Sequence, residues 1–177
     1  MNIDFSELTA TPIAPDIVMP EGLAADVEYV FSVTYTDPDA MEVAEFSKAA
    51  AIAIEREGLS LGTYPPPLGH EGLRKFISRE LKSNRGLDIS PDNLFLSSGA
   101  GGACQTIVDA FIDAGDVVMM DEFCYHGSLN MFLRKGAIPV HVKMDNDGMD
   151  PDALEIEIKK KLSEGIKPKL IYTISDY

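Results

Sequence analysis

Residues 93 to 102 read Asn-Leu-Phe-Leu-Ser-Ser-Gly-Ala-Gly-Gly, a strand-like run that enters a turn of small, uncharged residues. A helical pattern follows, from Ala103 to Ala114. Small residues let the backbone approach an anion closely, and the first N–H groups of a helix are unpaired donors at the positive end of its dipole. The turn therefore predicts a phosphate site, although a plain strand-to-helix turn has the same composition.

Two known phosphate-binding turns can be compared with this one by spacing. A P-loop is excluded because no Gly-Lys-Ser/Thr follows. The dinucleotide fingerprint fits better, since Gly99 and Gly101 are in place and Asp121 and Glu122 follow about 20 residues later, but Cys104 stands where a third Gly or Ala belongs. A small nucleotide-binding domain therefore stays open as an alternative.

A regular alternation of strands and helices surrounds and follows the turn. The pattern predicts strands at residues 94–97, 117–120, 138–142 and 170–174, and helices at residues 102–113, 127–135 and 151–163. Strands that alternate with helices in this way form parallel sheets. We therefore expect an α/β fold with a mostly parallel sheet and helices on both faces.

The part of the chain before this alternation has a different texture. Residues 1–45 are rich in proline and acidic residues and read as an N-terminal arm, with a short strand expected at residues 28–33. Helices are expected at residues 44–56 and 71–83. Between them, the three prolines of the Thr63 to Gly69 stretch force an extended, turn-rich path.

Composition and charge narrow the class of protein. A chain of 177 residues with 45% hydrophobic and 25% charged residues is typical of a soluble globular domain. A net charge of -14 opposes attraction to nucleic acid or to an anionic membrane surface. The first residues lack a basic segment followed by an apolar one, and no run approaches the ~18 apolar residues of a membrane span. We therefore expect a cytoplasmic protein that binds neither nucleic acid nor membrane.

Cysteine and histidine give no sign of a metal site. Cys104 and Cys124 are the two cysteines, with no CxxC and no Cys/His ligand spacing, so we expect two reduced thiols and no metal. His126 adjoins Tyr125, but no nucleophile or ligand partner lies at a recognisable spacing. We interpret His126 as a surface or helix-start residue.

A second chemical signal follows the second expected strand, at Tyr125. Ligands of open parallel sheets bind beyond the carboxyl ends of the strands, so the turn at Gly99 to Gly101 and the loop that holds Tyr125 can face one crevice. An aromatic face against a flat heterocycle adds roughly 0.5 to 1.5 kcal/mol beyond burial. The alternative is that Tyr125 caps the core.

Five segments, taken in order, resemble the pyridoxal-phosphate-dependent aminotransferases of the class I and II family, which have the aspartate-aminotransferase-like fold. They are Tyr-Pro-Pro-Pro-Leu-Gly-His-Glu-Gly-Leu-Arg at residues 64–74, the turn at residues 97–102, Asp-Val-Val at 116–118, Asp-Glu-Phe-Cys-Tyr at 121–125, and Ile-Tyr-Thr-Ile-Ser-Asp-Tyr at 171–177. The resemblance covers about residues 28–177. No single segment is decisive for this family, but the five segments in this order are.

The resemblance implies a cofactor site and a partner chain. Gly99, Ala100 and Gly101 would hold the phosphate of pyridoxal 5′-phosphate, and Tyr125 would stack on its pyridine ring. Tyr64 would reach the phosphate of the neighbouring subunit, which implies a homodimer. Residues 1–60 would form the arm and first helix, part of the small domain and of the dimer contact. Residues 61–177 would form the first half of the cofactor-binding large domain, left incomplete.

The sequence departs from the family pattern in two places. Many relatives have a hydroxyl or amide side chain where Ala100 and Gly101 stand, so here the phosphate would depend more on backbone N–H groups. The chain also stops before the Asn-Pro-x-Gly segment. With it are missing the acid for the pyridine nitrogen, the Schiff-base lysine, the phosphate-binding arginine and the arginine for the substrate carboxylate. We therefore predict no catalytic residue in this chain.

These expectations define a function. The intact protein would move an amino group from an amino acid to a 2-oxo acid through pyridoxal phosphate, in amino acid metabolism or biosynthesis, and this chain alone would be inactive. A lyase or a carbon–carbon bond-forming synthase of the same fold is an alternative. So are a non-catalytic truncated product and a regulator with an aminotransferase-like domain, although the chain has no basic helical domain at its start.

Overall fold

The structure of the protein, a computed structural model, describes residues 36–175. These residues belong to two compact units, one ending at Leu96 and one that takes up the chain again at Ser97. The strand expected at residues 28–33, most of the expected arm, and Asp176 and Tyr177 lie outside the described residues. The expected domain boundary after residue 60 stays a prediction.

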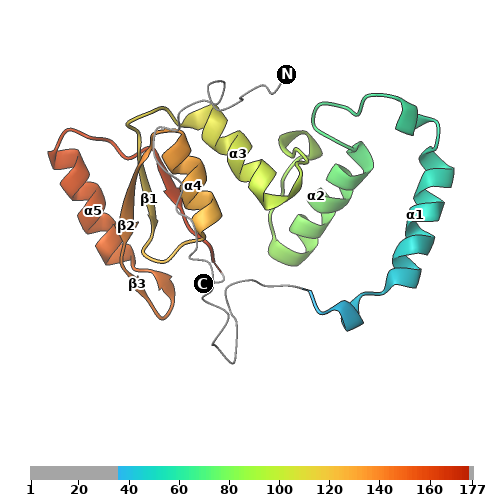
Figure 1. Cartoon of the computed structure of the whole chain (residues 1–177), viewed down its shortest axis with the longest axis horizontal. Coiled ribbons are helices and arrows are strands. Elements are labelled where there is room, and N and C mark those ends of the chain that lie inside the picture. Colours follow the sequence, from blue (N-terminus) through green and yellow to red (C-terminus); the bar gives the residue numbers. More distant parts are fainter. Residues whose placement is uncertain (1–35, 176–177) are drawn as a thin grey trace, which may run out of the picture. The chain divides into compact units, whose positions relative to one another are not determined.

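The described residues of the first unit include two α-helices (Figure 1). Helix α1 spans Val43–Glu57 and helix α2 spans Glu71–Arg85, which confirms both expected helices. Short 3-10 turns flank them at Pro38–Ala40, Ser60–Gly62 and Pro91–Asn93.

Helix α2 carries clear start and stop signals. His70 is its N-cap, and the Nδ1 atom of His70 accepts the N–H of Leu73 at 3.1 Å. That contact satisfies one of the N–H groups that have no partner inside the helix. Gly86 ends the helix in the left-handed conformation, with φ 69°.

Arg74 joins the loop before helix α2 to the turn after it. Its side chain is buried on α2, with a relative exposure of 6%. The guanidinium donates to the carbonyl of Gly69 at 3.3 Å and to that of Pro91 at 2.5 Å. A buried guanidinium needs such partners, so Arg74 fixes the end of the Thr63 to Gly69 stretch against the Pro91–Asn93 turn.

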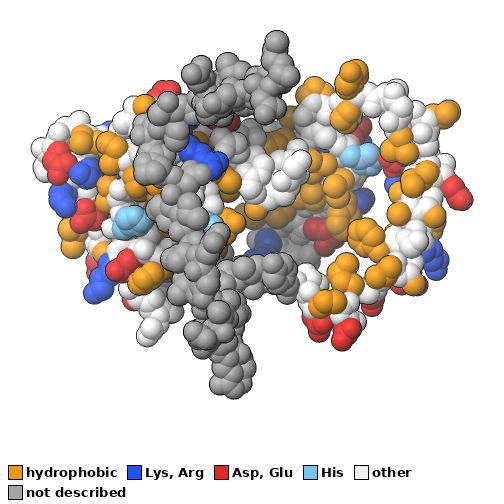
Figure 2. Space-filling view, viewed as in Figure 1, with side chains coloured by type: hydrophobic (Ala, Val, Ile, Leu, Met, Phe, Trp, Pro, Cys, Tyr) orange, Lys and Arg blue, Asp and Glu red, His pale blue; other side chains and the backbone are white. Residues whose placement is uncertain are grey.

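The first unit leaves much of α1 uncovered. Figure 2 shows hydrophobic side chains of this unit exposed on the face in view. On α1, Val43 is 68% exposed and Phe46 is 76% exposed, and no residue of the helix is buried. Exposed apolar side chains at this density are typical of a surface that another polypeptide covers.

A parallel sheet forms the centre of the second unit. Strand β1 spans Val117–Asp121, β2 spans Ile138–Val142 and β5 spans Leu170–Tyr172, in the order β2-β1-β5. Both pairs of neighbours are parallel. Helices α3, Gly99–Phe111, α4, His126–Arg134, and α5, Pro151–Ser163, surround the sheet (Figure 1).

The two faces of β1 pack against different helices. All five residues of β1 are buried, as expected for a central parallel strand. Val118 and Met120 belong to one hydrophobic cluster with side chains of α3 and α4, and Val117 and Met119 belong to another with side chains of α5. Successive side chains of a strand point to opposite faces, so this alternation confirms the expected helices on both faces.

The direction of winding reverses at β1. The chain passes from β1 through α4 to β2, and then from β2 through α5 to β5 on the other side of β1. Right-handed crossovers in opposite directions place their helices on opposite faces, as α4 and α5 are. The carboxyl end of β1 therefore lies at the kind of switch point where α/β sheets bind ligands.

Three details differ from the sequence-based expectation. Residues 94–97 are extended but do not form a strand, because the N–H groups of Leu94 and Leu96 donate to the carbonyls of Pro91 at 3.3 Å and Leu68 at 3.0 Å, neither of which belongs to a strand. Strand β5 ends at Tyr172 instead of residue 174. A short antiparallel pair, β3 at Met144–Asp145 and β4 at Gly148–Met149, was not expected from the sequence. The ladders expected at residues 94–97 and along β5 depend on partners distant in sequence, whereas the helices follow from local signals.

Candidate functional site

The small-residue turn forms the first turn of α3, three residues earlier than its expected helix start. Ser98 is the N-cap, and no side chain makes a capping hydrogen bond there. The N–H of Gly99 donates to the carbonyl of Ser97 at 3.0 Å, and Gly99 has φ 71°, which favours glycine. Gly99 therefore shapes the turn, whereas Ala100 and Gly101 carry N–H groups of the kind that have no acceptor within a helix.

The turn has open space at the side-chain position of Gly101. A Cβ atom at Gly101 would meet nothing nearer than the methyl group of Met131, at 3.8 Å, within the described part of the chain. Gly101 also has no left-handed φ. Neither packing nor backbone conformation requires glycine here, so the open space suits a ligand that approaches the backbone closely.

Tyr125 precedes α4 as its N-cap residue. Its carbonyl accepts the N–H groups of Ser128 at 3.1 Å and of Leu129 at 3.2 Å, which fixes the backbone of the residue. The side chain is half-exposed, and its ring centroid lies 4.9 Å from that of His126 at an interplanar angle of 60°. The ring is thus free on part of its surface rather than a cap on the core.

The hydroxyl of Tyr172 lies at the carboxyl end of β5, next to α4. This hydroxyl donates to the Oγ atom of Ser128 at 2.7 Å. Burial raises the pKa of Tyr172, and the thiols of Cys104 and Cys124 lie close enough to raise it further. The first turn of α3 and the loop of Tyr125 both lie next to α4, because a Cβ at Gly101 would be 3.8 Å from the methyl group of Met131 in α4 and Tyr125 is the N-cap of the same helix.

Asp121 ends β1, four residues before Tyr125, and its burial was not expected from the sequence. It ends the central strand with no exposed surface, and its Oδ2 atom accepts the N–H of Ile174 at 3.1 Å. Its Oδ1 atom is buried and has no hydrogen-bond partner among the described residues. The acid of a dinucleotide fingerprint must reach a ribose, and the burial of Asp121 removes it from that role. The sequence signal for a buried acid was present, because Asp121 directly follows the apolar run Val117 to Met120 of the central strand.

Tyr64, the fifth candidate for cofactor binding, belongs to the first unit. Its side chain is 99% exposed in the stretch between α1 and α2. His70 helps to close this stretch, because its Nε2 atom lies 2.8 Å from a carboxylate oxygen of Glu57 at the end of α1. The structure brings Gly99, Ala100, Gly101 and Tyr125 into one unit and leaves Tyr64 in the other.

The remaining polar candidates have local contacts. The Nδ1 atom of His141 lies 3.2 Å from the carbonyl oxygen of Asp121. Cys104 and Cys124 are free thiols, and burial raises the pKa of Cys124, with a further contribution from the carboxylate of Asp121. Within residues 36–175 no group of three His, Cys, Asp or Glu side chains could hold a metal ion, and no helix is long and apolar enough to cross a membrane.

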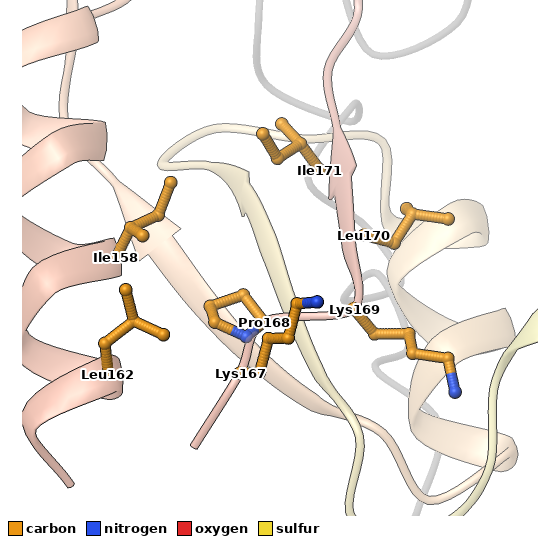
Figure 3. A pocket seen from close by; sticks show the side chains of 7 residues that line it. All are labelled: Ile158, Leu162, Lys167, Pro168, Lys169, Leu170 and Ile171. Carbon is orange, nitrogen blue, oxygen red and sulfur yellow. The ribbon is translucent and has the colours of Figure 1, made fainter. Parts of the chain in front are cut away.

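An apolar groove lies elsewhere in the second unit, between α5 and the start of β5 (Figure 3). Its volume is about 380 Å³, and Ile158 and Leu162 of α5 face Pro168 across it. The rest of the lining is Lys167, Lys169, Leu170 and Ile171. None of the candidate cofactor residues lines this groove, so the two features are separate.

Comparison with known proteins identifies the family. The family profile described as aminotransferase class I and II matches residues 34–175. Aromatic-amino-acid aminotransferase 1 of Thermococcus litoralis is 24% identical over 140 residues, which cover 79% of this chain and 34% of that protein. Putative aminotransferase YugH of Bacillus subtilis is 31% identical over 137 residues, which cover 76% of this chain and 35% of that protein.

A solved structure agrees with these relatives. The crystal structure of an archaeal alanine:glyoxylate aminotransferase is 37% identical, with a TM-score of 0.73, and the match covers 78% of this chain and 34% of that one. The chain thus spans about a third of the length of the relatives that it matches. Its incomplete parallel sheet with helices on both faces corresponds to part of that fold. The chain belongs to the class I and II aminotransferases, whose members depend on pyridoxal 5′-phosphate.

Proposed function

We propose that this chain supplies the part of an aminotransferase that holds the cofactor phosphate and one face of the cofactor ring. The observation that carries the proposal is the uncapped first turn of α3, which has open space at Gly101 and lies next to α4, the helix whose N-cap is Tyr125. The whole reaction would move an amino group from an amino acid to a 2-oxo acid.

Each residue would have a separate task. The N–H groups of Ala100 and Gly101 would donate to the phosphate oxygens, and the dipole of α3 would add to the attraction. Gly99 would hold the turn in its left-handed conformation. The ring of Tyr125 would lie against the pyridine ring and fix its plane. When bound, the cofactor supplies an electron-withdrawing ring that stabilises negative charge at the substrate carbon.

The residues fit the phosphate and the ring but not the whole reaction. No lysine of this chain matches the family's Schiff-base position, and we infer that the base for proton transfer comes from outside these 177 residues. We therefore expect the chain alone to bind cofactor weakly and to show no transfer of amino groups.

A second copy of the chain is the partner that we propose. Tyr64 is 99% exposed, and three consecutive prolines follow it, which restricts the backbone on one side of the ring. The exposed apolar side chains of α1 lie in the same unit. A rigid, exposed ring beside an apolar surface is suited to a subunit contact in which Tyr64 reaches the partner's cofactor phosphate.

The test of the cofactor site is a binding titration. Pyridoxamine 5′-phosphate is the best probe, because it lacks the aldehyde with which pyridoxal phosphate labels surface lysines. We expect binding by calorimetry that weakens strongly when the phosphate is removed, with pyridoxamine as the ligand. Binding of NAD without any binding of pyridoxamine 5′-phosphate would favour the nucleotide-binding alternative instead.

A further inference from the structure

Gly127 occupies a position in α4 that a side chain cannot share with Tyr125. A Cβ atom built on Gly127 would lie 2.5 Å from Cε1, 2.8 Å from Cζ and 3.0 Å from Oη of Tyr125. Real Cβ atoms essentially never show contacts below 3.0 Å. The ring of Tyr125 therefore lies in the space that any other residue at position 127 would fill.

No other feature of the described structure requires glycine at this position. Gly127 is not among the glycines with positive φ, so its backbone suits an L-amino acid. It lies in the first turn of α4, and its side-chain position meets no atom other than those of Tyr125 among its three nearest neighbours. Glycine also disfavours helices relative to alanine, by roughly 0.5 to 1 kcal/mol in a helix interior. The ring contact is the physical reason for Gly127.

The contact determines how the ring is presented. One edge of the Tyr125 ring occupies the side-chain position of Gly127, and the tilted ring of His126 lies beside it. About half of the Tyr125 surface remains exposed, at 51%. The ring therefore rests against position 127 on one side and offers its open side for stacking.

We infer that Gly127 is a positioning residue that sets the plane of the Tyr125 ring for the cofactor ring, an inference that rests on the proposed function. A methyl group at position 127 would displace the free end of a flexible side chain and not the backbone. The substitution Gly127→Ala should therefore leave the fold intact and move the ring. The loss of affinity should not exceed the value of the stacking contact itself.

The experiment is a double-mutant cycle in the full chain, with pyridoxamine 5′-phosphate as the ligand. Stacking contributes roughly 0.5 to 1.5 kcal/mol, so Gly127→Ala should weaken binding by about 2- to 13-fold. In a Tyr125→Ala background the same substitution should have no further effect on binding, because the ring that it displaces is gone. Gly62→Ala is the matched control, since a Cβ at Gly62 meets nothing within 4 Å.

The outcomes separate the inference from the proposed function. A wild-type chain that does not bind the probe contradicts the proposed function, and with it the inference. A wild-type chain that binds, together with unchanged binding in Gly127→Ala, overturns the inference alone. Equal losses from Gly127→Ala with and without Tyr125 would also overturn it. Near-ultraviolet circular dichroism of the tyrosines should change in Gly127→Ala and not in Gly62→Ala, which reports the ring movement without ligand.

Discussion

At Gly101 the requirements of stability and of ligand binding oppose one another. An added methyl group fits, because the nearest atom is the Met131 methyl at 3.8 Å, and alanine favours a helix over glycine by up to about 1 kcal/mol. We therefore expect Gly101→Ala to raise the free energy of unfolding slightly in urea denaturation. The bulkier Gly101→Leu should block the phosphate and weaken binding of pyridoxamine 5′-phosphate by at least about tenfold, the value of one charged hydrogen bond.

The comparison between folding and binding makes this prediction specific. Calorimetric titration and urea denaturation of the same samples measure the two quantities separately. Unchanged cofactor affinity in a folded Gly101→Leu variant would exclude the first turn of α3 as the phosphate site.

The carboxylate of Asp121 links the end of the central strand to the chain after β5. Substitution Asp121→Ala would leave the N–H of Ile174 without its acceptor, a loss of about 1 to 3 kcal/mol for a buried group. Asp121→Asn keeps an oxygen acceptor and should cost less. Equilibrium urea unfolding measures both values. An asparagine variant as unstable as the alanine variant would show that the charge itself is needed.

The thiol of Cys124 provides a pH-dependent test of the same region. Burial, and then the negative charge of Asp121, raise the pKa of Cys124 because both disfavour the thiolate. A raised pKa in the folded state stabilises the protein below the ordinary thiol pKa, and this contribution is lost as the pH rises through the folded value. In a Cys104→Ala background, the midpoint of alkylation by iodoacetamide against pH should lie above that of a free thiol. Adding Asp121→Asn should move the midpoint down, and no movement would remove Asp121 as a cause.

Among the elements, α2 depends on an unusual cap. The Nδ1 atom of His70 accepts the N–H of Leu73, and its Nε2 atom is then the donor to Glu57, which joins the end of α1 to the start of α2. Loss of an N-cap costs about 1 kcal/mol. We expect His70→Ala to destabilise the first unit by this amount, measured by urea unfolding followed by circular dichroism. His70→Asn should retain most of the stability, because an amide oxygen can also cap; equal losses in both variants would argue against capping.

At the scale of the whole molecule, apolar surface is exposed beside β5. This strand lies at an edge of the three-stranded sheet that the described residues form. Ile171 is 50% exposed and lines the apolar groove next to α5. Edge strands with apolar side chains pair with other chains, and lysine on the edge opposes this. We expect the chain to self-associate with rising concentration in sedimentation velocity, and Ile171→Lys to reduce this association.

The other edge of the same sheet supplies the control. Ile138 on β2 is 49% exposed but does not line the groove. The substitution Ile138→Lys should therefore reduce self-association less than Ile171→Lys. Equal effects of the two variants would show that general charge, rather than the β5 edge and its groove, controls the association.

The elements that depend on local signals can be predicted from the sequence, and these make up most of the described fold. Apolar periodicity, Asp150 before Pro151, and the buried run at β1 predicted the helices and the parallel strands within a few residues. The order of five short segments was enough to indicate the family. The placement of Gly99, Ala100, Gly101, Tyr125 and Tyr64 as cofactor residues remains a prediction.

Tertiary structure decided the features that depend on partners distant in the chain. Residues 94–97 have a strand-like sequence but no ladder among the described residues, since backbone pairing needs a neighbouring strand. The burial of Asp121 follows from its place at the end of the central strand, where it pairs with Val142 of β2 and accepts the N–H of Ile174 after β5. Gly127 is explained only by the position of a ring two residues away, because space and contact are properties of the folded chain.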